Sequence, residues 1–216
     1  MTVKIDFELL ADPVELARCG GWSEEVYRDL LAIEAGEMSE AGFDKKYLAE
    51  KAILVLDLTG FTVTAIERGA VHSFLRILDA HQLCMPVLFD QQAELVRVFA
   101  DDIVALFPTA DQGLNAALEI HRRTGSEAWL QDERVQHARC CIGLGFGQVY
   151  TIGPNLAMGD EMNRTSKLGE DIARGGETLL SEGAYQALRH RDDVNFEDQK
   201  TDDRPFPYYS ARSPRQ

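Results

Sequence analysis

The stretch Ile53-Leu54-Val55-Leu56-Asp57-Leu58-Thr59-Gly60-Phe61 decides the fold. Its first four residues are branched and apolar, which is typical of a central strand buried on both faces. The strand is expected to end at Asp57, and the residues after it turn the chain toward a helix. A carboxylate at the exposed end of a buried strand, followed by a helix start, suits a metal-bound phosphate. A plain helix N-cap is the more common role of such an aspartate, so this stretch alone leaves both interpretations open.

The residues after this stretch predict a helix and then a hairpin. The helical pattern extends to about Leu83, and its expected apolar face consists of Ile66, Phe74, Leu75, Leu78 and His81. Strand-like runs over 94–99 and 103–107 then flank Ala100-Asp101-Asp102. This arrangement predicts a β-hairpin whose tip carries two acids.

The second half of the chain favours an α+β fold. Another helix opens at Thr109, and the later elements are expected at 138–145, 148–152, 161–172, 178–181, 182–188, 194–196 and 206–211. The strands 138–145 and 148–152 are interpreted as a pair broken by Gly143, Gly145 and Gly147. The order βαββα, followed by two strands, a helix and further strands, indicates an α/β sandwich with a mostly antiparallel sheet and flanking helices.

Residues 1–48 form a different kind of segment from residues 49–216. Asp12-Pro13 is a helix start that runs to Gly20, and Ser23 can cap a second helix. We interpret residues 1–48 as an amphipathic helical arm that packs on the main domain or on a partner chain, with a regulatory role as the alternative.

Composition excludes several classes of function. The net charge of −14 disfavours non-specific binding to nucleic acid, and the 45% of hydrophobic residues suffices for a real core. No apolar run approaches the ~20 residues of a membrane span, and no secretory signal is visible, so we expect a cytoplasmic protein. The four cysteines have no zinc spacing and are expected to be buried free thiols.

Two further polar groups can carry chemistry. Asp101 and Asp102 are ordinary turn formers, but one of them could share one or two divalent ions with Asp57. Asn163 and Lys167 lie four residues apart, hence on one helical face, where they could orient a ribose and neutralise phosphate charge. A solvated polar face is the alternative for the second group.

Taken together, these groups resemble the class III nucleotidyl cyclase catalytic domain of the adenylate and guanylate cyclase superfamily. The resemblance covers roughly residues 51–212, and it is carried by residues 56–62, 97–107, 142–149, 159–163 and 179–185. It implies a ferredoxin-like α/β sandwich that binds a nucleoside triphosphate. It also implies a homodimer in which each active site draws residues from both chains.

The resemblance also implies a role for individual residues. Asp57 and Asp101 correspond to the two metal-binding aspartates, with the Leu58 carbonyl as an extra ligand for two divalent cations, Mn²⁺ or Mg²⁺. The backbone N–H groups implied to bind the triphosphate are those of Thr59, Gly60 and Phe61. Asn163 corresponds to the asparagine that orients the ribose, and Lys200 to a late lysine that contacts phosphate.

Three positions depart from the family pattern. Lys167 stands where the family usually has a transition-state arginine, and lysine keeps the charge but loses the fork of donors. Arg97 replaces the lysine that contacts adenine, and Leu156 replaces a polar residue that reads the purine. Arg97 donates only, which suits uracil carbonyls, and a bulky Leu156 shrinks the pocket.

These departures favour a pyrimidine substrate. The chain resembles the bacterial pyrimidine cyclases of the Pycsar anti-phage system, which implies UTP as substrate and cyclic UMP as second messenger. The alternatives are an adenylate cyclase that makes cyclic AMP, a non-catalytic nucleotide-binding regulator on the same fold, and a purely structural dimerisation module.

Overall fold

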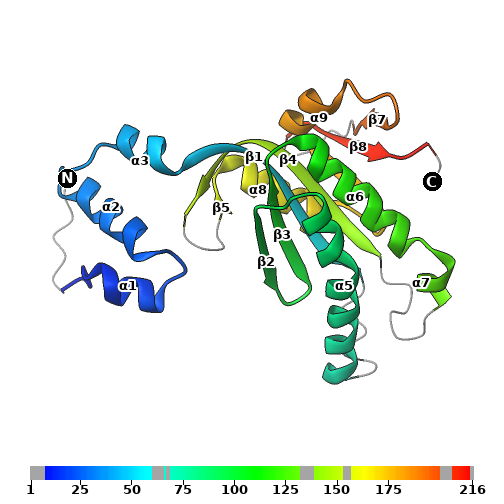
Figure 1. Cartoon of the computed structure of the whole chain (residues 1–216), viewed down its shortest axis with the longest axis horizontal. Helices are drawn as coiled ribbons and strands as arrows, with labels where there is room; N and C mark the ends of the chain where they lie inside the picture. The colour runs from blue at the N-terminus through cyan, green and yellow to red at the C-terminus, as the bar shows by residue number, and fades with distance from the viewer. Residues whose placement is uncertain are drawn as a thin grey trace. The chain divides into compact units, whose positions relative to one another are not determined.

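The computed structural model describes residues 8–59, 66, 69–131, 139–152, 157–199 and 206–214. Contacts divide the chain into two compact units, Met1–Ala49 with Tyr150–Met158, and Glu50–Val149 with Gly159–Gln216 (Figure 1). Within the described residues, no helix has the length and apolar character needed to cross a membrane. The division into an arm and a main domain at residue 48 stays a prediction.

The described residues of the first unit form three helices and a short strand, besides the ends of two longer strands. These are α1 (Pro13–Cys19), α2 (Glu24–Glu34), α3 (Glu40–Tyr47) and β5 (Ala157–Met158). Asp12 and Ser23 cap α1 and α2 as expected, because their side chains accept hydrogen bonds from the first free backbone N–H groups. The α3 helix is an addition to the predicted arm, and the unit is held by a small core around Val26, Tyr47 and Ile152.

The second unit is built on a mostly antiparallel sheet, which confirms the predicted fold class. The strands are β1 (Leu48–Leu58), β2 (Leu95–Phe99), β3 (Asp102–Phe107), β4 (Cys140–Thr151), β6 (Thr178–Ser181), β7 (Asn195–Asp198) and β8 (Tyr208–Arg212). Their order is β2-β3-β1-β4-β6-β8-β7. In the described residues, β4 and β6 pair in parallel, whereas β1–β3, β2–β3, β6–β8 and β7–β8 pair antiparallel. The strand with the deciding stretch, β1, is therefore central.

Helices cover both faces of this sheet. They are α5 (Ala70–Asp90), α6 (Ala110–Thr124), α7 (Glu127–Gln131), α8 (Asp160–Ser166), the π-helical segment η1 (Lys167–Ile172) and α9 (Glu182–Leu188). Leu54, Leu56 and Leu58 point from β1 into the main core with Leu88 of α5 and Leu114 of α6. Because side chains alternate along a strand, Val55 and Asp57 face the other side of the sheet.

The opposite face carries α8 and η1, which lie very close to the strands. A Cβ atom at Gly143 of β4 would be 2.3 Å from the Thr165 carbonyl oxygen, and one at Gly169 of η1 would be 2.6 Å from the Val55 carbonyl oxygen. Glycine is required at both positions, because real Cβ atoms do not approach other atoms so closely. The predicted helix over 161–172 is present, and it changes at Lys167 from an α-helix to a π-helix.

The glycines of β4 do not break it, contrary to the prediction of two strands over 138–145 and 148–152. A single strand runs from Cys140 to Thr151. The side of the strand that lacks side chains at Gly143 and Gly145 is covered by Thr165 and Glu161. Glycine here serves close packing of a helix and not a turn.

The predicted apolar face of the helix after β1 is also wrong. Phe74, Leu75 and Leu78 are 63%, 46% and 48% exposed, and Ile66 is 80% exposed. The helix α5 extends beyond Leu83 to Asp90, and the residues that it buries are Ser73, Arg76, Ala80, Cys84, Val87 and Leu88. The buried stripe is therefore a different one from the stripe that the spacing of Phe74, Leu75 and Leu78 predicts.

Candidate active site

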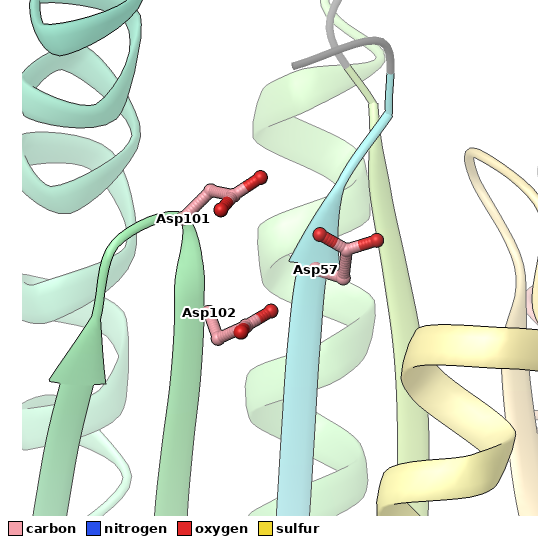
Figure 2. A group of neighbouring side chains, drawn as sticks. All are labelled: Asp57, Asp101 and Asp102. Carbon is pink, nitrogen blue, oxygen red and sulfur yellow. The ribbon is translucent and has the colours of Figure 1, made fainter. Parts of the chain in front are cut away.

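Three aspartates converge where β1 ends beside the β2–β3 hairpin. Figure 2 shows Asp57 on β1, Asp101 in the turn that enters β3, and Asp102 at the start of β3. One carboxylate oxygen from each residue lies within 4.8 Å of the others. The hairpin and its two acids are thus where the sequence predicts them.

The strand register explains why Asp102 belongs to the group. Leu56 of β1 pairs with Ile103 of β3, so the next residues outward, Asp57 and Asp102, come opposite each other. Like charges directly opposite on antiparallel strands destabilise a sheet. The sequence prediction assigned Asp101 alone from this pair, because adjacent acids in a turn do not reveal which one faces the neighbouring strand.

The negative charges alter the protonation of the site. Burial, reinforced by the charge of Asp101, raises the pKa of Asp57 to about 6, although the Leu58 backbone N–H donates to its Oδ1 at 2.7 Å and opposes the shift. Burial and Asp101 likewise raise the pKa of Asp102. Burial and Asp102 raise the pKa of Glu170 of η1, which makes it a further acid near the cluster that the sequence prediction missed.

The residue after β1, Thr59, is held by its neighbours. Its backbone N–H donates to the Arg139 carbonyl at 3.0 Å, and its Oγ1 accepts from the Arg139 N–H at 3.0 Å. The amide predicted to bind a triphosphate therefore already has an acceptor in the protein. A role for Thr59 in substrate binding stays a prediction and would require that bond to open.

Asn163 of α8 and Lys167 of η1 are both exposed. Lys167 Nζ is 2.8 Å from Asp171 Oδ2, an ion pair between half-exposed side chains. The helix that carries them is anchored by Glu161, whose Oε1 accepts from the Phe146 N–H at 3.1 Å and from the Ser181 hydroxyl.

Arg97 faces the same side of the sheet as Asp57. It pairs with Val104 of β3, and Val104 pairs with Val55 of β1, two residues before Asp57. Its side chain is exposed, and its positive charge opposes the upward shifts in the pKa of Asp102 and of Glu170. A contact of Arg97 with the base of a nucleotide stays a prediction.

The remaining predicted residues, Gly60, Phe61, Leu156 and Lys200, lie outside the described residues. Among the described ones, Asp57 and Asp101 are brought together, with the backbone of Leu58 beside them. Asn163 and Lys167 lie together on the α8–η1 segment. Their joint role in one site stays a prediction.

Several solved structures of nucleotide cyclases have the same fold. The guanylate cyclase domain of RhGC from Catenaria anguillulae, solved in complex with GTP, matches with a TM-score of 0.64 and 16% identity over 76% of this chain and 96% of that chain. The adenylyl cyclase CyaB from P. aeruginosa matches with a TM-score of 0.62 and 19% identity over 78% and 97%. An adenylate/guanylate cyclase/hydrolase from Silicibacter pomeroyi matches with a TM-score of 0.62 and 22% identity over 76% and 95%.

These likenesses show that the chain has the fold of class III cyclase domains, as the sequence predicted. No protein-family model and no curated protein matches the sequence.

Proposed function

We propose that the protein is a metal-dependent nucleotide cyclase, which converts a nucleoside triphosphate into a 3′,5′-cyclic nucleotide and pyrophosphate. The observation that carries this proposal is the convergence of Asp57, Asp101 and Asp102 at the end of β1, in a fold shared with cyclase domains. The ribose 3′-oxygen attacks the α-phosphorus, its proton is released, and the bond from that phosphorus to the pyrophosphate oxygen breaks.

The donor set fits hard divalent cations. Carboxylate and carbonyl oxygens are the ligands that Mg²⁺ and Mn²⁺ prefer, and Asp57, Asp101 and the Leu58 carbonyl would hold two such ions. Asp102 supplies a further carboxylate within reach. When bound, the cations lower the pKa of the 3′-hydroxyl and neutralise the phosphates.

The chain's own cations and amides would orient the substrate. We assign ribose orientation to Asn163 and phosphate contacts to Lys167 and Lys200, with Thr59, Gly60 and Phe61 at the triphosphate. Exchange of the Lys167–Asp171 ion pair for a phosphate would cost little, because exposed ion pairs contribute only about 0–1 kcal/mol.

For this function we also propose a homodimer in which each active site contains residues of both chains. Asn163 and Lys167 are exposed and would reach the triphosphate of the opposite chain. Mixing inactive Asp57→Ala with inactive Asn163→Ala should restore some activity, because a mixed dimer can assemble one site free of both lesions. Demonstrated subunit exchange without rescue would contradict the shared site.

For the base, we propose uracil, with cyclic UMP as a messenger in cytoplasmic anti-phage signalling. Support comes from Arg97, which is exposed on the face that carries Asp57 and offers donors for uracil carbonyls. One alternative is an adenylate cyclase that makes cyclic AMP from ATP. The other is a regulatory domain that binds a nucleotide without turnover.

The test is incubation with each of the four ribonucleoside triphosphates and Mn²⁺, followed by separation of the products. UTP should be preferred, and Arg97→Ala should lose UTP turnover by roughly ten- to a hundredfold, because uracil would be left with unpaired acceptors. Equal loss for all substrates would place Arg97 away from the base. Preference for ATP would reject the pyrimidine assignment, and tight binding without pyrophosphate release would favour the regulator.

A further inference from the structure

A buried arginine, Arg76, lies on the face of α5 that packs against the sheet. It is 3% exposed, and its neighbours along this stripe, apart from Ser73, are the apolar Ala80, Cys84 and Val87. Burial of a guanidinium costs several kcal/mol unless its donors and its charge are used. An arginine in this mostly apolar stripe therefore calls for a role.

Arg76 holds the backbone immediately after the metal-site strand. Its Nη2 donates to the Thr59 carbonyl oxygen at 3.0 Å. On its other side, Thr59 is bonded to Arg139 through both its N–H and its Oγ1. Both peptide groups of Thr59 thus have a fixed direction.

This fixed direction determines where the Leu58 carbonyl points. In a trans peptide unit the C=O and the following N–H point in opposite directions. The Thr59 N–H points to Arg139, at the start of β4, and β1 lies between β4 and β3. The Leu58 carbonyl therefore points toward the β3 side, where Asp101 and Asp102 lie.

The charge of Arg76 also faces this site. The negative charge of Asp101 raises the pKa of the Arg76 guanidinium against the larger, lowering effect of burial. Arg76 is thus a fixed positive charge near the acids, and on charge alone it would weaken the binding of a cation there.

We infer that Arg76 is a positioning residue: by holding the Thr59 carbonyl it fixes Thr59, whose N–H is bonded to Arg139, so that the Leu58 carbonyl joins Asp57 and Asp101 in holding a divalent cation. The inference rests on the proposed function, since that cation is the one required for cyclisation. It assigns no contact between Arg76 and the substrate.

The test is Mn²⁺ binding by the full chain, measured by calorimetry or electron paramagnetic resonance without nucleotide. Arg76→Met should weaken Mn²⁺ binding by about tenfold, the lower end of the effect of removing groups that orient metal ligands. If Arg76 acted through its positive charge alone, its removal would strengthen Mn²⁺ binding. Arg76→Lys keeps the charge and one donor and should recover most of the affinity.

A matched control is Arg122→Met on α6, whose side chain is 69% exposed and paired with Glu119. It should bind Mn²⁺ like the wild type. Should Arg76→Met fail to fold, Arg76→Gln is the second variant: its amide ends two bonds short of the position of Nη2, so it loses the bond to the Thr59 carbonyl and is expected to bind Mn²⁺ more weakly than Arg76→Lys.

Unchanged or tighter Mn²⁺ binding by folded Arg76→Met, or by Arg76→Gln in its place, would overturn the inference. Mn²⁺ binding that responds to Arg76 in a chain that cyclises no nucleotide would refute the proposed function and leave the positioning role standing. If the wild type cyclises a nucleotide but its Mn²⁺ affinity does not change when Arg76 is substituted, the positioning role is refuted and the proposed function stands. A wild type that binds no Mn²⁺ would overturn both.

Discussion

Two carboxylate groups on the same side of the sheet differ in what surrounds them. Glu161 on α8 is 8% exposed, and its carboxylate accepts from the Phe146 N–H and the Ser181 hydroxyl. In the described part of the chain, Asp57 accepts a hydrogen bond from the Leu58 N–H and faces Asp101 and Asp102. The first carboxylate is satisfied by donors and stabilises the fold, whereas the second is crowded by like charges that a cation would neutralise.

The largest expected effect is the loss of turnover when Asp57 is substituted. Asp57→Asn should reduce turnover by roughly 10³-fold or more, as loss of the groups that neutralise charge in phosphoryl transfer commonly does. Its thermal stability should not fall, because the substitution removes repulsion. Pyrophosphate release and a thermal melt, both on purified protein, measure the two quantities, and retention of normal turnover would refute the metal role of Asp57.

Added Mn²⁺ should stabilise variants at Asp57 and at Glu161 to different extents. At a concentration 100 times the dissociation constant, Mn²⁺ should stabilise the wild type by about 2.7 kcal/mol, because a cation that binds only the folded state adds its binding free energy. Asp57→Asn should lose most of this gain, whereas Glu161→Gln should keep it. The measurement is urea unfolding with and without Mn²⁺, and an equal gain in all three proteins would place the cation elsewhere.

Loss of Glu161 should act on the fold. Glu161→Ala leaves the Phe146 N–H and the Ser181 hydroxyl without their acceptor, which should lower the free energy of unfolding by about 1–3 kcal/mol. Glu161→Gln keeps one acceptor oxygen and should cost less. Urea unfolding gives the values, and a change smaller than that of an exposed control such as Glu127→Ala would contradict the anchoring role.

The smallest effect is a pH dependence without metal. Because burial and its acidic neighbours raise the pKa of Asp57 to about 6 from 3.8, the folded state takes up a proton before the unfolded chain does as the pH falls. Asp57 therefore adds stability as the pH is lowered from 7 toward 5, and Asp57→Asn abolishes this contribution.

The comparison of the two proteins isolates this contribution from other titrating groups. Burial lowers the pKa of His121 to about 4, which makes acid destabilising at that residue in both proteins. The difference in unfolding free energy between wild type and Asp57→Asn, measured at several pH values, should move in favour of the wild type on acidification. If this difference in unfolding free energy did not change with pH, the raised pKa of Asp57 would be excluded.

The sequence predicts the strand that carries Asp57, the hairpin acids, the caps at Asp12 and Ser23 and the helix start at Thr109, because these features depend on local residue order. It does not predict which face of α5 is buried. Phe74 and Leu78 have the expected helical spacing, but they are exposed, and the side of α5 that carries Ala80 and Cys84 is buried instead. The contribution of Asp102 depends on the register between β1 and β3, and that of Arg76 on contact between α5 and the end of β1. Both depend on tertiary packing.

The close approach of α8 and η1 to the sheet has a consequence for mutational scanning. Any side chain at Gly143 or Gly169 would collide with backbone atoms of the opposing element, so a library selected for activity should be depleted at both positions. Such a map would give these glycines the same score as Asp57, although neither contributes a group to the chemistry. A second map, selected for abundance of folded protein, would distinguish them, because it would remain depleted at the two glycines and tolerate substitution of Asp57.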